Sequence, residues 1–227
     1  ERRLVQQEIA AEEAPAEEDR FEIIAGGFED DQYAEYVAHG EPMKQALLAL
    51  HDGRTAEALA QLEALRASAD APRYLWFELG RARLAEGDAA GGAEALGRFL
   101  ESLHDEEGGD ARLLAHIELA QLVHAGGDFD AAVAHYEKAL AAMPDDPRPY
   151  LALAGFFRRE QLLDEAREVL EAALNARQER EVDFRVWHEL GLVHADAGRD
   201  EEAIARLEQV VDYLTRRNQR DLPPEGT

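Results

Sequence analysis

The chain has 227 residues, of which 46% are hydrophobic and 7% aromatic, which is enough apolar material for a folded core. Its formal net charge is −25, from 49 acidic against 24 basic side chains, and a surface this negative repels nucleic acid and anionic lipid. It contains no cysteine, which excludes disulfides, thiol catalysis and cysteine-based zinc sites. No sufficiently long apolar run occurs, so no membrane-spanning helix is predicted within the chain.

The first 38 residues form an acidic extension with 12 acidic and 3 basic side chains. The stretch AAEEAPAEED contains Pro15 and is typical of a linker or a disordered segment. The next stretch, RFEIIAGGF, is apolar enough to dock on a neighbouring element, and DDQYAEYVAH is predicted to form a short helix. Residues 1–38 are therefore interpreted as an extension that is partly disordered or docked.

A unit of about 34 residues recurs five times in the rest of the chain. Each copy has one turn residue between two amphipathic stretches, and the five turn residues are Gly53, Gly87, Gly127, Gln161 and Gly198. Their separations are 34, 40, 34 and 37 positions. The two longer separations contain polar inserts, ESLHDEEGGD at 101–110 and RQEREVD at 177–183.

Each unit is predicted to form two helices around its turn. In the third unit, LLAHIELAQLVHA has apolar residues at helical spacing, Gly-Gly-Asp interrupts it, and FDAAVAHYEKALAAM resumes the period up to Pro144. Glycine supplies a turn that a Cβ would strain, and the alanine five residues later lets the two helices pass closely. The predicted units occupy about residues 39–72, 73–106, 113–146, 147–180 and 184–217.

The units resemble the tetratricopeptide repeat family over roughly residues 40–214. The family's first-helix pattern is carried here by Trp76, Leu79, Gly80, by Tyr150, Leu153, Ala154, Phe157, and by Trp187, Leu190, Gly191. Its second-helix pattern is carried by Ala132, Tyr136, Ala139 with Pro144, and by Ala166, Leu170, Ala173. The first unit departs at Gln45, and the second has Gly92 in place of alanine. The resemblance implies an all-α fold, a right-handed superhelical solenoid of about five helix-turn-helix repeats over residues 39–215, with a tail at 218–227.

The last unit has no obvious capping helix, because ARLEQVVDYLTRRNQR leads directly into DLPPEGT. Leu207, Val210 and Leu214 form one stripe at three- and four-residue spacing. Either residues 216–220 prolong the last helix, or the last apolar face meets a partner. A homo-oligomer formed through residues 204–217 is one such arrangement.

A search for chemical motifs predicts no catalytic, metal or cofactor site. The stretch GDAAGGAEALG lacks the lysine of a phosphate-binding loop, and HELGLVH separates its two histidines by six positions, on different helix faces. His116 and His124 are eight apart and can share a face, but two ordinary imidazoles are the more frequent case. No serine nucleophile motif occurs, and we predict a protein that is not an enzyme.

The resemblance also implies a concave groove that is lined by the first helices and holds partner peptides. Glu78 and Glu118 stand where the family's carboxylate-binding version has asparagine, so a clamp for acidic C-termini is not predicted, although Lys44 fits one of its places. The groove residues assigned on this basis are Phe77, Glu78, Arg81, Ile117, Glu118, Gln121, Leu151, Arg158, Arg159, Arg185, His188 and Glu189. Glutamates, an apolar strip and a basic patch that includes Arg148 suit a basic or mixed-charge peptide. The alternative is that the glutamates are solvated and the arginines pair with nearby acids.

The function predicted from the sequence is a non-enzymatic scaffold or adaptor that holds a partner's peptide segment in its groove. The alternatives are a self-assembling scaffold joined through the last repeat, and a regulatory domain of a larger enzyme or membrane-anchored protein. The chain begins at Glu1 rather than Met, which leaves open a signal peptide or anchor upstream. A cytoplasmic location is favoured over a periplasmic or membrane-anchored one, but the sequence does not fix the compartment.

Overall fold

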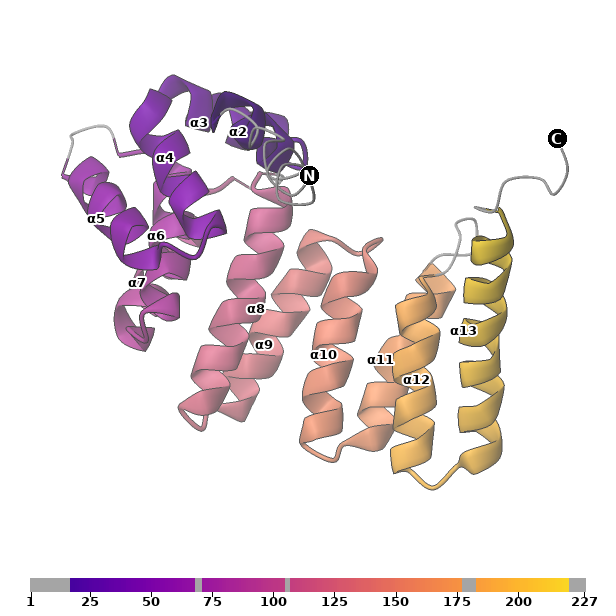
Figure 1. Ribbon diagram of the computed structural model, residues 1–227. Helices are drawn as coiled ribbons and strands as arrows, with labels where there is room; N and C mark the ends of the chain where they lie inside the picture. Colours follow the sequence, from indigo (N-terminus) through magenta and orange to yellow (C-terminus); the bar gives the residue numbers. More distant parts are fainter. Residues whose placement is uncertain (1–16, 68–70, 105–106, 177–182, 221–227) are drawn as a thin grey trace, which may run out of the picture. The chain divides into compact units, whose positions relative to one another are not determined.

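The computed structural model describes residues 17–67, 71–104, 107–176 and 183–220, and within these ranges the fold is all-α, with twelve helices and no strand (Figure 1). The helices are α2 (Glu17–Ala25), α3 (Asp30–Ala38), α4 (Gly40–His51), α5 (Thr55–Arg66), α6 (Arg73–Ala85), α7 (Ala89–Ser102), α8 (Gly109–Ala125), α9 (Phe129–Ala142), α10 (Pro147–Arg159), α11 (Leu163–Ala176), α12 (Phe184–Asp196) and α13 (Asp200–Arg220). They divide into two compact units, and the boundary falls within α8 between Ala115 and His116. We call these unit 1 and unit 2.

Five helix pairs, α4–α5 to α12–α13, share one type of turn. In the first pair the Gly53 N–H donates to the Leu50 carbonyl at 3.1 Å, and the Arg54 N–H donates to the Ala49 carbonyl at 2.8 Å. These two bonds define a Schellman motif, which needs a left-handed residue after the helix. The corresponding residue has a positive φ in all five turns, namely Gly53, Gly87, Gly127, Gln161 and Gly198. The turn positions predicted from the sequence are therefore confirmed.

Aspartates begin several of the helices that follow a turn or a connection. Asp88 accepts a hydrogen bond from the Gly91 N–H at 2.9 Å at the start of α7, and Asp128 does the same for Ala131 at the start of α9. Such N-caps are typically worth about 1 kcal/mol each. The polar insert predicted at 101–110 is shorter in the structure, because α7 continues to Ser102 and α8 already begins at Gly109. The insert predicted at 177–183 lies almost entirely outside the described residues.

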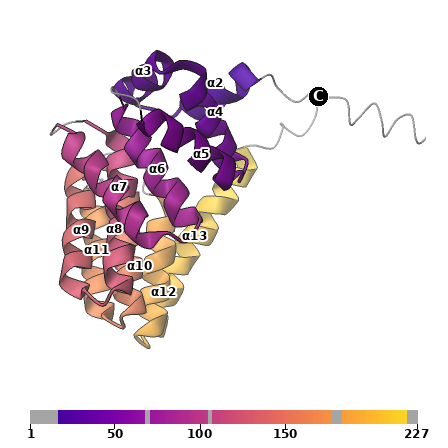
Figure 2. The same ribbon diagram turned by 90° about the vertical axis from the view of Figure 1, so that its left-hand side faces the viewer.

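In unit 1 the N-terminal helices are part of the fold. Both α2 and α3 pack on α4, and α3 also contacts α6 (Figure 2). Their buried aromatic rings continue into the repeat core, with Tyr36 6.3 Å from Tyr74 and Tyr74 5.3 Å from Phe99, measured between ring centroids. Residues 17–38 are thus docked helices, whereas the predicted acidic linker lies mostly outside the described residues.

The glycines of the second pair allow an unusually close approach of α6 and α7. A Cβ placed on Gly80 would lie 2.7 Å from the Leu96 side chain and 3.3 Å from the Gly92 carbonyl oxygen. A Cβ placed on Gly92 would lie 2.4 Å from the Leu84 side chain. The departure from alanine at position 92 therefore has a packing reason, because leucines fill the space that a methyl group would take.

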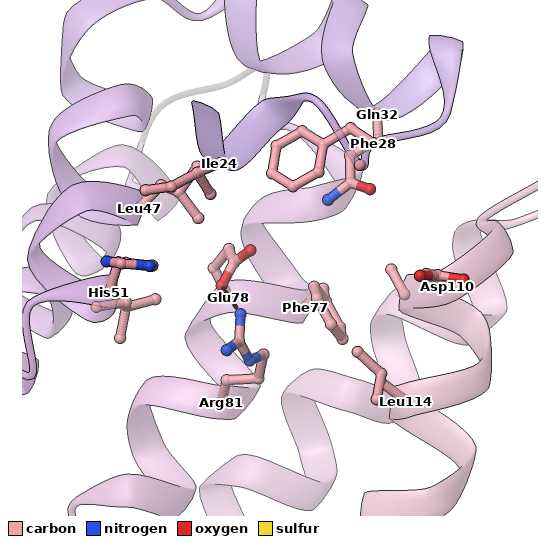
Figure 3. Close-up of a pocket in the computed structure, with 13 residues that line it drawn as sticks. Ile24, Phe28, Gln32, Leu47, His51, Phe77, Glu78, Arg81, Asp110 and Leu114 are labelled. Carbon is pink, nitrogen blue, oxygen red and sulfur yellow. Dashed lines mark hydrogen bonds and ion pairs between the residues drawn. The ribbon is translucent and has the colours of Figure 1, made fainter. Parts of the chain in front are cut away.

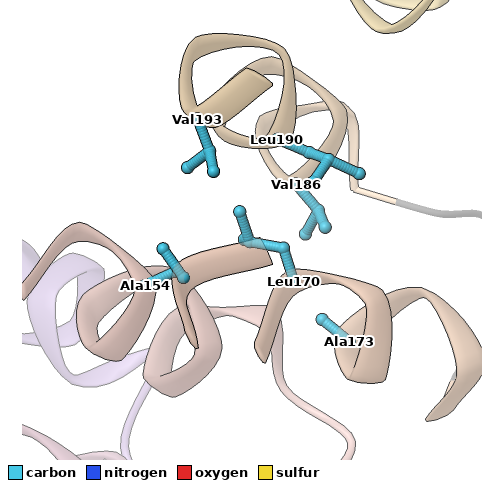
Figure 4. Close-up of a cluster of buried hydrophobic side chains, with 7 residues drawn as sticks. Ala154, Leu170, Ala173, Val186, Leu190 and Val193 are labelled. Carbon is cyan, nitrogen blue, oxygen red and sulfur yellow. The ribbon is translucent and has the colours of Figure 1, made fainter. Parts of the chain in front are cut away.

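In unit 2 the small and large residues of the repeat pattern interlock between α10, α11 and α12. Figure 4 shows this buried cluster, which consists of Ala154, Ala166, Leu170, Ala173, Val186, Leu190 and Val193. A second cluster lies between α8, α9 and α10 and consists of Ala120, Ala132, Tyr136, Leu153 and Phe156. The residues that carried the repeat pattern are thus mostly core residues of the helix pairs, as expected for stacked repeats.

The last helix, α13, reaches Arg220, so residues 216–220 prolong it. It packs on α12, where the Tyr213 ring stacks on Phe184 at 5.6 Å and meets Trp187 edge-on at 6.3 Å between centroids. Val210 is buried against the fold, whereas Leu214 is exposed. The predicted stripe is therefore divided between a face used within the chain and a face turned outward.

Candidate functional site

Unit 1 contains a cavity of about 220 Å³ on the face formed by α4 and α6, the first helices of their pairs. Figure 3 shows its walls, to which the α2–α3 connection and the start of α8 also contribute. The residues that line it are Ile24, Gly27, Phe28, Gln32, Leu47, Leu50, His51, Phe77, Glu78, Arg81, Asp110, Ala111 and Leu114. Three of the residues assigned to the groove from the sequence, Phe77, Glu78 and Arg81, therefore lie together in this cavity.

Helical periodicity explains why these residues share one face. Leu47, Leu50 and His51 lie three and four positions apart on α4, and Glu78 and Arg81 lie three apart on α6. This face includes the buried side chains of Leu47 and Phe77, and Phe77 also contacts Phe99 of the second helix α7, with 5.2 Å between the ring centroids. His51 and Arg81 add polar groups to the same face.

Glu78 is a buried carboxylate, with only 1% of its surface exposed. Its Oε1 accepts a hydrogen bond of 2.5 Å from the Tyr36 hydroxyl of α3, and its Oε2 accepts one of 3.0 Å from Arg81 Nη1. The Gln32 side chain also hydrogen-bonds Tyr36. Burial, followed by the Glu78 charge, raises the pKa of Tyr36 well above its ordinary value, so the hydroxyl keeps its proton and remains a donor.

This arrangement differs from the expectation of a glutamate facing open solvent in the groove. The physical reason is that α3 lies over this part of α6 and brings a hydroxyl group to the carboxylate. A buried carboxylate needs such partners, because an unpaired charge in the interior is costly. Both carboxylate oxygens of Glu78 are thus bound within the protein, one by Tyr36 and one by Arg81.

Side chains of α3 also bind the first residues of α6. The Glu35 carboxylate accepts a hydrogen bond of 2.6 Å from the Tyr74 N–H and pairs with Arg73 at 3.1 Å. The Tyr74 hydroxyl donates to Asp31 at 2.8 Å. The N-cap of α6 is Pro72, which provides no side-chain acceptor, so Glu35 supplies from another helix the acceptor that a cap would normally provide.

The rim of the cavity combines apolar and charged groups. The Arg81 guanidinium lies over the Phe77 ring, 5.5 Å from its centroid, while Leu114 on the opposite side is 40% exposed. His51 and Asp110 lie at opposite ends of the cavity in Figure 3. A site of this kind can accept an apolar side chain and contact charged groups beside it, which is the usual composition of a binding pocket.

In unit 2 the predicted groove residues are distributed along α8, α10 and α12 and are largely engaged in ion pairs. Arg158 pairs with Glu189 at 3.2 Å and with Asp196 at 2.5 Å. Arg148 pairs with Asp146 at 2.8 Å, and Arg185 pairs with Asp183 at 2.6 Å. The expected open basic patch is thus largely paired with acids, as in the alternative considered from the sequence. The remaining predicted groove residues here are partly buried or exposed, namely Ile117, Glu118, Gln121, Leu151, Arg159 and His188.

The histidines singled out from the sequence each have their own neighbour. His116 Nδ1 lies 3.2 Å from His135 Nδ1, and His124 Nε2 lies 3.1 Å from a Glu160 carboxylate oxygen. His116 and His124 therefore interact with different neighbours and do not form the shared metal-binding face that their spacing allows. Among the described residues, no group of three or more potential ligands is arranged to hold a metal ion.

Successive antiparallel helix pairs, each closed by the same left-handed turn, define a helical repeat protein. Two family models described as tetratricopeptide repeat match the chain, one at residues 77–147 and the other at 123–187. The chain belongs to the tetratricopeptide repeat family. No curated protein matches it in sequence.

Solved structures with the same fold are distant in sequence. BtubC from P. vanneervenii is 19% identical with a TM-score of 0.64, and the match covers 94% of this chain and 96% of that one. MamA from Desulfovibrio magneticus RS-1, residues 41 to the end, is 16% identical with a TM-score of 0.59, covering 86% and 100%. The C-terminal part of a TPR repeat-containing protein from Cytophaga hutchinsonii is 13% identical with a TM-score of 0.63, covering 74% and 63%.

Repeats of this family are typically non-enzymatic and bind other proteins, and the chain is accordingly a protein–protein interaction scaffold. Among the described helices, none combines the length and the apolar character needed to cross a membrane.

Proposed function

We propose that this scaffold binds an extended peptide segment of a partner protein in the unit 1 cavity, by enclosing one apolar side chain that basic residues flank. The observation that carries the proposal is the composition of the cavity. Its walls are mainly apolar, and Arg81, His51 and Asp110 lie at its edge. A cavity of about 220 Å³ is large enough for one leucine- or phenylalanine-sized side chain rather than for a folded element.

The preference for basic flanks comes from the field of the whole unit rather than from Glu78. Residues 1–115 contain 26 acidic and 11 basic side chains, a net charge of −15. Glu78 itself is screened from a ligand by Tyr36 and Arg81. A field of this sign accelerates the encounter with basic segments and disfavours acidic ones and nucleic acid.

The experiment that tests the proposal measures binding of short synthetic peptides by calorimetry. The peptides share one leucine or phenylalanine anchor and differ only in flanking residues, which are basic, neutral or acidic. We expect the basic series to bind tightest. Its advantage should shrink as salt is raised, because the screening length for exposed charges falls to about 8–10 Å at an ionic strength of about 0.1–0.15 M. Tighter binding of the acidic series would contradict the proposal.

A matched pair of variants ties the binding to the cavity. Ile24 lines the cavity, whereas its neighbour Ile23 on α2 is 72% exposed and does not. Ile24→Ala should weaken the anchor peptide roughly tenfold, because it removes part of the apolar wall. Ile23→Ala removes the same atoms elsewhere and should leave affinity unchanged. An equal effect of the two variants would place the binding site outside the cavity.

A further inference from the structure

α13 presents an apolar stripe to the outside of unit 2. Ile204, Val211 and Leu214 are 56%, 62% and 42% exposed. Leu207, which lies between them at a spacing of three and four residues, is half-buried, because its side chain packs beside Gly191 of α12. In the preceding pair, the second helix α11 is covered by α12. Among the described residues, no helix covers α13 in the same way. Exposed apolar stripes of this width usually mark contact surfaces.

The sequence of α13 is mirrored about Gln209. Five positions before Gln209 lies Ile204 and five after it Leu214, and two before lies Leu207 and two after it Val211. Six charged residues follow the same mirror with opposite sign, since Glu201 corresponds to Arg217, Glu202 to Arg216 and Arg206 to Asp212. Asp200 and Glu208 do not, because they correspond to Asn218 and Val210. A helix with this order is complementary to its own reverse.

We propose that α13 is a homodimerisation helix, which pairs antiparallel with α13 of a second copy across a two-fold axis at Gln209. In that pairing Ile204 faces Leu214 of the other copy, and Val211 faces the exposed part of Leu207. The acidic start of one helix lies at the height of the basic end of the other. A parallel pairing would bring acid beside acid and base beside base. A two-fold interface requires such self-complementarity, whereas binding to an unrelated partner does not.

Interactions within the helix do not account for this order. The helix dipole favours acids at the start and bases at the end, but it does not require the apolar stripe to share their centre. Within α13, Arg216 pairs with Asp212 at 3.6 Å, and both side chains are largely exposed. Exposed pairs of this kind contribute little to stability. The common centre at Gln209 is therefore explained by a contact between two helices.

One residue works against the pairing. Glu208 is exposed, lies beside the stripe and is one position from the proposed axis. The two copies of Glu208 would differ in height by only about 3 Å, twice the rise per residue of a helix. Their repulsion makes a specific prediction: Glu208→Gln should tighten the dimer about threefold, because it removes one unfavourable charge pair.

The association is measured by sedimentation of the full chain from micromolar to millimolar concentration. Val211→Glu should weaken dimerisation by roughly thirtyfold or more, the effect of losing a central apolar contact. Ile23→Glu alters an isoleucine of α2 that is even more exposed, at 72%, and should leave the dimer unchanged. A strictly monomeric protein, including the Glu208→Gln variant, would overturn the proposal and would indicate that another segment covers the stripe.

Crosslinking determines the direction of the pairing, because the chain contains no cysteine of its own. A short thiol crosslinker should join two copies of Glu208→Cys, whose positions lie near the axis. It should not join two copies of Glu201→Cys, which an antiparallel pairing separates by about 24 Å along the helix axis. Efficient crosslinking of Glu201→Cys would show a parallel pairing and refute the proposal.

Charge reversal provides a rescue test that does not depend on the apolar stripe. Glu201 and Arg217 lie three positions from Ile204 and Leu214, so they flank the stripe. Glu201→Lys and Arg217→Glu should each weaken the dimer, because either change brings like charges to the same height at both ends. A mixture of the two variants should associate more tightly than either alone, since each of these positions then meets an opposite charge. Failure of the mixture to do so, with both variants folded by circular dichroism, would contradict the role of these charges.

Discussion

Units 1 and 2 both have a glutamate at the same position of a repeat, but the two glutamates have different partners. Glu78 in α6 and Glu189 in α12 each precede a Leu-Gly pair, so the two carboxylates begin from equivalent places. In unit 1, Tyr36 of the additional helix α3 covers the carboxylate and binds it. In unit 2 the carboxylate pairs with Arg158 of the preceding first helix. The repeat determines where a side chain lies, and its neighbours determine what that side chain does.

The two units can be followed separately, because the chain has two tryptophans and each unit contains one. Trp76 lies on α6 in unit 1, and Trp187 lies on α12 in unit 2. Variants with a single Trp→Phe replacement therefore report on one unit at a time. The two tryptophans therefore distinguish unfolding of unit 1 from unfolding of unit 2.

The largest effect is expected from the equivalent core leucines, Leu79 and Leu190, which are both fully buried. Replacement of either by alanine should cost about 2–5 kcal/mol, because the surrounding helices cannot close the space that is left. In urea unfolding, Leu79→Ala should shift the Trp76 transition more than the Trp187 transition, and Leu190→Ala should do the reverse. Equal shifts of both reporters would show that the two units unfold as one.

A smaller but specific effect is expected from the hydroxyl group that covers Glu78. Tyr36→Phe removes the donor to a buried carboxylate and should cost about 1.5–3 kcal/mol in the transition reported by Trp76. Tyr33→Phe is the matched control, because the Tyr33 hydroxyl donates to Glu22 at the surface. That control should change stability by less than about 0.5 kcal/mol. Similar values for both variants would mean that Glu78 is not held by Tyr36.

The smallest effect concerns pH and unit 2. Burial, followed by the charge of Lys138, lowers the pKa of His135 below its ordinary value of 6.5. Since the unfolded chain then binds a proton more readily than the folded one, the stability contributed by neutral His135 is complete above pH 6.5 and decreases as the pH falls below it. The Trp187 transition should weaken over this range, and His135→Gln should reduce the dependence. His194, whose pKa burial also lowers, contributes with the same sign. A dependence unchanged in His135→Gln would contradict this assignment.

The sequence was sufficient to predict the features that recur in every repeat, such as the turns. It was not sufficient to predict contacts that occur only once in the chain. Gly53, Gly87, Gly127 and Gly198 could be placed because a left-handed turn has few alternatives to glycine, and even Gln161 was located by its spacing. The contact of Tyr36 with Glu78 could not be placed, because it joins residues 42 positions apart and no local pattern encodes it. The aromatic residues in an otherwise acidic segment, Phe21, Phe28, Tyr33 and Tyr36, were the available signal that residues 17–38 are packed.

The ion pairs of unit 2 illustrate the same limit. Arg158 could be assigned to the groove face from its position in α10, but its pairing with Glu189 and Asp196 depends on how α12 lies beside α10. With 49 acidic residues in the chain, the sequence offers many possible partners for each arginine. Only the packing of the helices selects among them, so the charge that a surface presents is a tertiary property.

The shared turn has a consequence for how such a chain can change length over evolution. Inside every helix pair, the first helix leads into the second through the same two backbone hydrogen bonds around one left-handed residue, so this turn depends on main-chain geometry more than on side chains. Gln161 demonstrates this, since it adopts a φ of 62° and makes the same bonds as the four glycines. A segment that runs from one such turn to the next can therefore be duplicated or deleted while the turn at each of its ends stays the same. The repeats can therefore vary in number while their turns stay the same. A helix that occurs only once, such as α3, gives the repeat it covers side-chain contacts that the other repeats lack.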